Sequence, residues 1–249
     1  MPGRADTAIT EYLQINGYHP RSSRHGDALC SYVVQDLVDL CPSFRKAAEQ
    51  DRIVFQTNYT ITPDSADRWN IDLVVGPPGE GCFPAEHRLG PIAQGDPGEI
   101  WVAIDAKTIM TEHGKARRNR QRDLNSFQDI LHRKNRKTIA GGLLVVNIAK
   151  RFRTPLPRAS GELNEHRNIE RLVEEIVAMM GALGRADTVA TQTGLEALGI
   201  IVVSHTNVSG DPTQLITTHP APQPGSALSY AVFQKDLCEA FESRFAGAK

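Results

Sequence analysis

The chain has 249 residues, of which 40% are hydrophobic and 23% are charged, and its formal net charge is −1. This composition is ordinary for a globular protein with one well-buried core or two small ones. The longest apolar runs, around 143–148 and 198–203, are far too short to form a helix that crosses a bilayer, so no membrane partner is expected.

The N-terminal quarter of the chain predicts an arm, two helices and a strand. Residues 1–26 are expected to form a loosely ordered arm with one short helical turn near 9–15, and residues 27–249 a single domain. From Asp27 to Pro42 the apolar residues recur at helical spacing, which predicts a helix that the proline ends. A second helical segment over 43–50 precedes a strand over about 53–61.

The next two strands each carry an acid inside an apolar run. Asp72 lies in the segment 70–76 and Asp105 in the segment 100–107. Lys107 follows Asp105 by two positions, so both side chains leave the same face of the strand. An unpaired buried charge costs on the order of several kcal/mol, so these groups are expected to pair with each other or with a metal.

A Gly- and Pro-rich segment, 76–98, separates these two strands. It contains six Gly and five Pro in 23 residues, a composition that disfavours helices and interior strands. We expect it to be a long exposed loop, and the segment 206–226 to be a second one. Loops of this length in a compact domain are usually functional or disordered.

The second half of the chain alternates helices and strands. It predicts helices over about 112–134, 168–183 and 228–245 and strands over about 139–148 and 199–204. The succession strand, helix, strand from 100 to 148 predicts a βαβ unit with parallel strands. The complete order predicts an α/β fold, in which helices flank a central mixed sheet of about five strands.

Basic residues are concentrated in the helix 112–134 and just after it. Residues 115–137 contain nine Lys or Arg and two Asp, whereas the remainder of the chain is net acidic. Such asymmetry is typical of a protein that binds a polyanion. The alternative is a solvated helix with many ion pairs, which needs more acidic neighbours than Glu112, Asp123 and Asp129 provide.

The four cysteines give no sign of a structural bond. Cys30, Cys41, Cys82 and Cys238 are far apart and form no C-x-x-C pair, which predicts neither a zinc site nor a disulfide framework. We expect free thiols in a reducing cytoplasm. The chain does not begin with a basic stretch followed by an apolar core, so no secretory signal is expected.

The spacing of Asp72, Asp105 and Lys107 resembles the catalytic signature of the PD-(D/E)XK nuclease superfamily, which has a restriction-endonuclease-like fold. Asp72 matches the first acid of that signature, Asp105 the second acid and Lys107 the lysine. Two positions depart from it, because Ile71 replaces a proline and Asp105 stands where Glu is commoner. The likeness covers residues 27–150.

The resemblance implies a Mg²⁺-dependent endodeoxyribonuclease that also accepts Mn²⁺, in a restriction or phage-defence role. Asp72, Asp105 and the carbonyl of Ala106 would hold the metal, and Lys107 would orient or deprotonate a water. In such folds a helix ahead of the first acid often adds a carboxylate, for which Glu49 is the candidate. A homodimer is expected, since duplex cleavage usually needs two sites.

The basic helix is the expected contact for DNA. Its candidate residues are His113, Lys115, Arg117, Arg118, Arg120 and Arg122. For His113 the alternative is an ordinary surface histidine.

Other functions remain open. The chain could be a repair or recombination nuclease, or a DNA-binding module in which Lys107 only pairs with Asp105 in a degenerate site. It could also be a structural α/β domain whose basic helix contacts an acidic protein.

Overall fold

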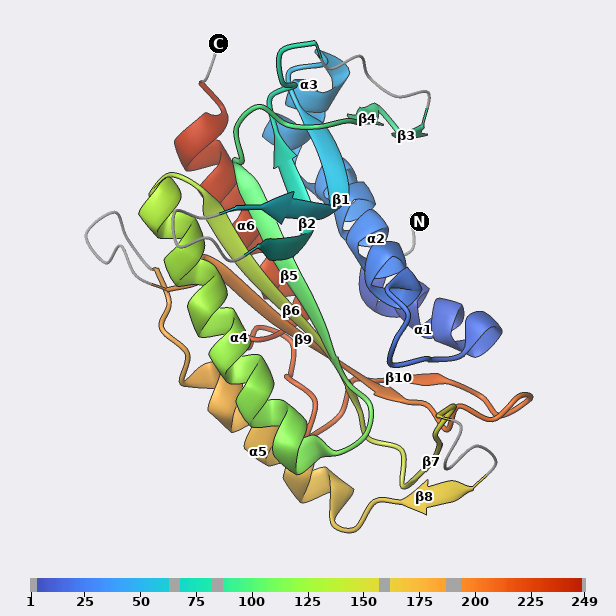
Figure 1. The fold of residues 1–249 in the computed structure, drawn as a ribbon. Helices are drawn as coiled ribbons and strands as arrows, with labels where there is room; N and C mark the ends of the chain where they lie inside the picture. Colours follow the sequence, from blue (N-terminus) through green and yellow to red (C-terminus); the bar gives the residue numbers. More distant parts are fainter. Residues whose placement is uncertain (1–3, 63–67, 82–86, 157–161, 187–193, 248–249) are drawn as a thin grey trace.

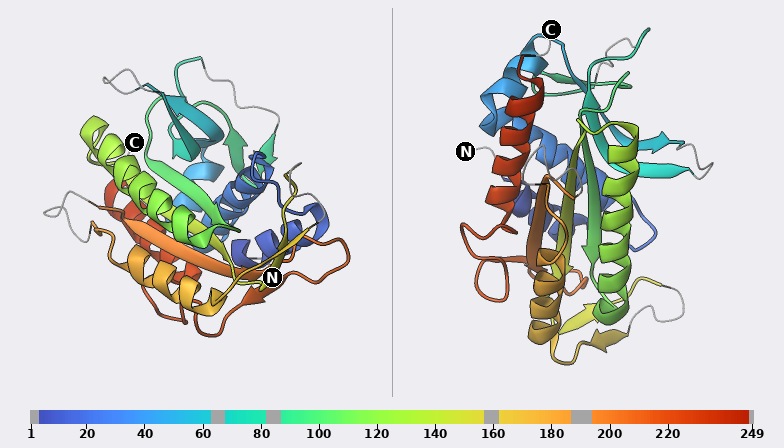
Figure 2. Two further views of the ribbon diagram at one scale, coloured as in Figure 1. Left: turned by 60° about the horizontal axis from the view of Figure 1, so that its bottom comes forward. Right: turned by 90° about the vertical axis from the view of Figure 1, so that its left-hand side faces the viewer.

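The computed structural model describes residues 4–62, 68–81, 87–156, 162–186 and 194–247. Within these ranges helices flank both faces of a mixed sheet of eight strands (Figures 1 and 2). The order across the sheet is β10-β9-β6-β5-β2-β1-β4-β3. No described helix is both long enough and apolar enough to span a membrane.

The five longest strands are the five that the sequence predicts. They are β1 (Val54–Ile61), β2 (Trp69–Gly76), β5 (Val102–Ile109), β6 (Ile139–Asn147) and β9 (Ala197–Ser204). β2 pairs antiparallel with both β1 and β5, whereas β5, β6 and β9 are parallel. The predicted βαβ unit is confirmed, with α4 (His113–Lys134) as its crossover.

The prediction of about five strands was too low, because the sheet continues through short edge strands. These are β3 (Arg88–Leu89), β4 (Ile92–Gln94) and β10 (Gln214–Ile216), and β7 (Arg151–Arg153) pairs with β8 (Leu163–Glu165) in a separate ribbon. The expected exposed loop 76–98 is also partly wrong. Ile92 and Ala93 in β4 are buried, and β4 pairs parallel with β1.

The helices divide between the two faces of the sheet (Figure 2). One face is covered by α1 (Ala5–Asn16), α2 (Arg24–Leu40), α3 (Pro42–Glu49) and α6 (Tyr230–Phe245). The other face is covered by α4 and by α5 (Ile169–Gly181). Each set of helices buries its apolar stripe on the sheet, which gives two hydrophobic cores.

The N-terminal segment is not a loose arm. Its helix α1 has twelve residues, and Ala5, Ile9 and Leu13 are buried in the core that α2 shares. The backbone N–H of Ala5 donates to Asp36 Oδ2 of α2 at 2.7 Å, which satisfies a donor at the start of α1. The predicted turn over 9–15 is the second half of this helix, whose first turn was missed because it contains a single buried residue, Ala5.

The cysteine prediction is also wrong for one pair. Cys41 and Cys238, which are 197 residues apart, form a disulfide that ties the junction of α2 and α3 to α6. Cys30 is free and buried, and Cys82 lies outside the described residues. With this bond present, the cysteines no longer support the expectation of a reducing compartment.

Candidate active site

The two strands that carry acids are neighbours, and the acids meet where the pairing of these strands ends. β2 and β5 pair from Val75–Val102 to Leu73–Ile104. Asp72 and Asp105 are the next residues on each strand. Here the Asp72 carboxylate accepts a hydrogen bond from the Ala106 backbone N–H at 2.8 Å, and the end of the hairpin of β1 and β2 projects from the sheet (Figure 2, right).

Lys107 joins the two acids. Its Nζ donates to Asp72 Oδ2 at 3.1 Å and forms a close ion pair with Asp105 Oδ1. The side chain of Asp105 is 0% exposed, whereas those of Asp72 and Lys107 are 22% and 21% exposed. The cluster is therefore open to solvent on the side of Asp72 and Lys107 and closed behind Asp105.

Burial sets the protonation of this cluster. Burial raises the pKa of Asp105 to about 7; Lys107 opposes the shift and Asp72 adds to it. For Lys107, burial alone would lower the pKa, but the carboxylates of Asp105 and Asp72 outweigh it and raise the pKa. The two carboxylates thus favour the protonated form of Lys107, and in this form its ammonium group donates a hydrogen bond to each of them.

The oxygens at this position fit a hard divalent cation. Asp105 Oδ2 is buried and has no hydrogen-bond partner, which is uncommon for a carboxylate oxygen. In a β-strand the N–H and the C=O of one residue point to the same side of the strand. The Ala106 N–H points toward Asp72, so the Ala106 carbonyl lies on that side of β5 as well. Two carboxylates and a carbonyl are the oxygen ligands that Mg²⁺ takes.

Glu49 does not belong to this cluster. It is exposed at the end of α3, and β1 begins five residues later, where Val54 pairs with Gly76. Asp72 lies four residues further along the β1–β2 ladder, about 13 Å away at 3.3 Å per residue. The prediction chose the wrong helix, because α2 rather than α3 approaches the acids.

The carboxylate that α2 brings near the site is Asp27. It accepts hydrogen bonds from Ser23 Oγ at 3.0 Å and from Asn58 Nδ2, and Asn58 is opposite Asp72 in the β1–β2 ladder. Burial lowers the pKa of the neighbouring His25, and the charges of Asp27 and Asp72 partly reverse that shift. Both carboxylates therefore act on one imidazole.

Sequence reasoning missed Asp27, because no local pattern separates it from Glu49. Asp27 precedes Cys30 by three residues, so both lie on one face of α2, and Cys30 is completely buried. Burial raises the pKa of the Cys30 thiol well above its usual value, and Asp72, Asp27 and Asp105 raise it further. Only the packing of α2 on β2 and β5 brings Asp27 toward the acids.

Three of the predicted DNA contacts form one exposed stripe on α4. Lys115, Arg118 and Arg122 are exposed and are spaced at i, i+3 and i+7, so they share one face of the helix. Arg122 donates to Asn119 at 3.1 Å, within the same helix. This face points away from the core that contains Leu124.

Arg117 and Arg120 are engaged within the protein. Arg117 forms an ion pair with Glu175 of α5, and Arg120 pairs with Asp123 at 3.1 Å. The Nε atoms of both arginines are buried. Arg117 links α4 to α5, whereas the ion pair of Arg120 lies within α4. The assignment of these two residues to DNA stays a prediction.

His113 is a core residue rather than a surface one. It is 2% exposed, its Nε2 donates to the Asn147 carbonyl at 2.7 Å, and its ring packs edge-on against His166. Burial, followed by the influence of His166, lowers its pKa to about 4 despite the hydrogen bond to Asn147. The predicted contact with DNA is therefore not possible in this structure.

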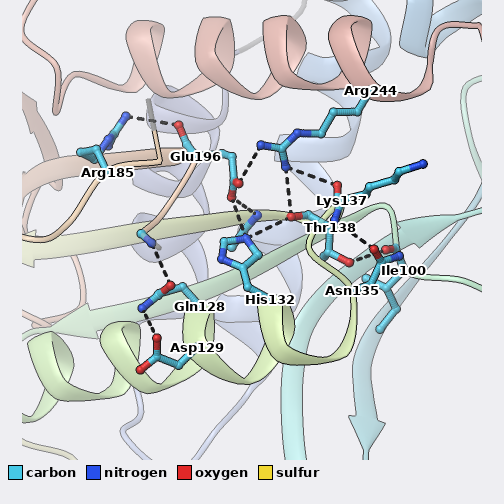
Figure 3. Close-up of polar contacts among 12 residues, drawn as sticks. Ile100, Gln128, Asp129, His132, Asn135, Lys137, Thr138, Arg185, Glu196 and Arg244 are labelled. Atoms are coloured by element: carbon cyan, nitrogen blue, oxygen red, sulfur yellow. Dashed lines mark hydrogen bonds and ion pairs between the residues drawn. The ribbon is translucent and has the colours of Figure 1, made fainter. Parts of the chain in front are cut away.

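A second buried acid, Glu196, has a structural role (Figure 3). Its Oε1 accepts from Arg244 at 2.8 Å, and its Oε2 accepts from the Ala140 N–H at 2.8 Å and lies 3.3 Å from His132 Nε2. Arg244 also donates to the carbonyl of Thr138 at 3.2 Å. Both carboxylate oxygens have partners, so this cluster fastens α4 and α6 to the sheet.

The site is thus composed of Asp72, Asp105 and Lys107, with Asp27 nearby and the Lys115–Arg118–Arg122 stripe on the following helix. We compared the chain with protein-family models, with curated proteins and with solved structures, and nothing matched it.

Proposed function

We propose that this protein is a Mg²⁺-dependent endodeoxyribonuclease with a restriction-endonuclease-like core. The observation that carries the proposal is the convergence of Asp72, Asp105 and Lys107 around a buried carboxylate oxygen that has no partner. Asp72, Asp105 and the Ala106 carbonyl would hold Mg²⁺ or Mn²⁺. A homodimer and a restriction or defence role remain predictions, and repair or recombination is the alternative role.

Asp72, Asp105 and Lys107 would have different roles in hydrolysis. A bound divalent cation stabilises the negative charge that builds up on a phosphate during hydrolysis. Asp105 is closed off from solvent and has one carboxylate oxygen without a partner, which would bind the cation, and Asp72, which is partly exposed, would complete the site from the open side. Lys107 donates hydrogen bonds to both acids, and beside a bound cation it would orient or deprotonate a water, which are the two roles expected for it.

A non-cutting DNA-binding module is the second candidate, because Lys107 already bonds both acids, as a purely structural ion pair would. The two functions differ in what the cluster does with metal. A nuclease needs the metal and all three side chains for cleavage. A binding module keeps its affinity for DNA when the metal is removed or when one of these side chains is replaced.

The test is nicking of supercoiled plasmid by the purified protein with Mg²⁺ and with EDTA. We expect cleavage only with Mg²⁺, and its loss in Asp72→Ala, Asp105→Ala and Lys107→Ala, with DNA affinity kept within a few-fold. Lys46→Ala, at an exposed position of α3, is the matched control and should cut normally. Wild-type cleavage by Lys107→Ala would refute the assignment, and DNA binding without any cleavage would favour the second candidate.

A further inference from the structure

We propose that a basic rim holds the backbone of double-stranded DNA on both sides of the acidic cluster. The rim consists of Arg21 just before α2 and Arg24 at its start, Lys115 and Arg118 on α4, and Lys150 and Arg151 around the start of β7. The proposal rests on the proposed nuclease function and extends it in two ways. It names the strandedness of the substrate, and it adds two binding segments outside the basic helix.

Packing contacts bring the segment before α2 to the carboxyl end of β5. Tyr18 Oη lies 3.3 Å from the hydroxyl of Thr108, the residue after Lys107. The Tyr18 ring also contacts the ring of His25, with the centroids 4.9 Å apart. Arg21 and Arg24 lie between these two aromatic anchors in the sequence, so they are held on the α2 side of the site.

The same anchor positions β7. Tyr18 packs edge-on against Phe152, and Asn207 joins the two segments by accepting from the Tyr18 N–H and donating to the Arg153 carbonyl, both at 2.8 Å. Phe152 is buried, whereas its neighbours Lys150 and Arg151 are exposed. The buried ring therefore fixes the backbone from which the two cations project.

A further set of contacts ties β7 to the start of α4. The His166 N–H donates to the Lys150 carbonyl at 2.7 Å, and the His166 ring packs against His113, the first residue of α4. Lys115 and Arg118 follow within the next two turns. The three basic segments are thus connected around one end of the sheet, where β5 ends just after Lys107 (Figure 1).

The charges of the rim are available to a ligand. All six side chains belong to exposed residues, and within the part of the chain that the structure describes none of them forms an ion pair. Glu165 is opposite Arg151 in the β7–β8 ladder, and Glu112 precedes α4, so acids are present but fewer. Unpaired surface cations around a site attract a polyanion.

The chemistry of the rim favours a duplex over a single strand. Proteins that bind single strands combine a basic groove with aromatic side chains on which bases stack. Among the described residues no Phe, Tyr or Trp side chain is exposed, and near the rim Phe152 is buried and Tyr18 is engaged with its neighbours. A rim that offers cations without stacking platforms recognises phosphates, which a duplex presents on its outside.

The experiment measures binding of a short labelled duplex, and of each of its single strands, in Ca²⁺ over about 50 to 200 mM salt. Two paired charge reversals, Arg21→Glu with Arg24→Glu and Lys150→Glu with Arg151→Glu, should each weaken duplex binding. Each should lower the slope of log affinity against log salt by about two units, since one phosphate contact contributes about 0.9. Lys46→Glu with Lys235→Glu, on exposed positions of α3 and α6, makes the same change in charge and should leave the slope unaltered.

The possible outcomes distinguish failure of the basic rim from failure of the proposed nuclease function. Tighter binding of single strands, or wild-type slopes in both rim variants, would overturn the inference while the nuclease proposal stands. Absence of DNA binding in the wild-type protein would overturn both. If a reversal unfolds the protein by circular dichroism, the neutral pair Lys150→Gln with Arg151→Gln replaces it, with an expected loss of slope of about two units again.

Discussion

At the scale of single residues, burial decides what each ionisable group can do. Asp105 and His113 are both buried away from solvent, which raises the pKa of Asp105 and lowers the pKa of His113. Both shifts favour the neutral form of the side chain. Lys107 is the exception, because two carboxylates within hydrogen-bond distance outweigh its burial. The same type of residue can therefore be a site residue or a core residue, and only the packed neighbours distinguish the two.

Asp72, Asp105 and Lys107 could be selected from the sequence because charges inside apolar strands contradict the local pattern. Asp27 and Glu49 could not be separated in this way, since both are acids on helices ahead of the first acidic strand. Which helix approaches the site depends on the crossing of α2 over β2 and β5, and this is a tertiary property. The prediction that His113 contacts DNA failed for the same reason, because the segment around His166 covers the start of α4.

The low pKa of His113 predicts a specific loss of stability in acid. An unfolded histidine has a pKa near 6.5, whereas in the folded protein the pKa is about 4. Between these values the unfolded state binds more protons, so stability falls as the pH falls from 6.5 to 4. Protonation would also place an N–H at the buried Nδ1, which has no acceptor.

In His113→Gln this contribution should disappear. The side-chain amide can still donate toward the Asn147 carbonyl but does not titrate. We expect the loss of unfolding free energy between pH 7 and pH 4.5 to be smaller in the variant by about 2 kcal/mol. Urea unfolding at the two pH values measures it. Equal losses in both proteins would mean that His113 is accessible to protons in the folded state.

At the scale of secondary-structure elements, length determined what could be predicted. The five long strands and α4 have enough apolar residues to be found by periodicity, and their bounds differ from prediction by about two residues or fewer at most ends. β3, β4 and β10 have two or three residues each, among Gly and Pro. Their pairing depends on backbone hydrogen bonds to a neighbour, which leave no pattern in the side chains.

Adjacent arginines on α4 should respond oppositely to charge reversal. Arg117 is 17% exposed and paired with Glu175 on α5, so Arg117→Glu places two acids together and should lower the melting temperature by several degrees. Arg118→Glu, on the exposed stripe, should stay within about 0.5 kcal/mol of wild-type stability. It should instead lower the salt slope of DNA binding by about one unit.

Thermal unfolding and salt-dependent binding of the two variants test this pair. Because the substitutions are identical and lie at neighbouring positions, differences in charge or helix propensity do not explain a divergent result. A stable Arg117→Glu protein with weakened DNA binding would place Arg117 among the DNA contacts.

At the scale of the whole molecule, the chain joins distant segments that no local pattern could have paired. Cys41 follows α2 and Cys238 lies in the last helix, and their separation of 197 residues is the reason that spacing gave no hint of a bond. The same holds for Glu196 and Arg244, which fasten α6 to the sheet. Fold class could be inferred from the order of elements, but closure of the fold around α6 could not.

The disulfide should contribute measurably to stability. A bond that closes so long a loop restricts the unfolded chain, and loss of such a bond costs roughly 2–5 kcal/mol. We expect Cys238→Ala to lower the melting temperature by about 5 to 15 °C. A reducing agent should lower the melting temperature of the wild-type protein toward that of the variant and leave the variant itself unchanged.

Mass spectrometry of an unreduced digest adds an independent readout, because it detects the linked peptides that contain Cys41 and Cys238. The active site gives a contrast, since the bond lies beside α3 and α6 and not among Asp72, Asp105 and Lys107. Plasmid cleavage by Cys238→Ala below its melting temperature should therefore match that of the wild type. Identical melting curves with and without reducing agent would show that the two thiols are not bonded in solution.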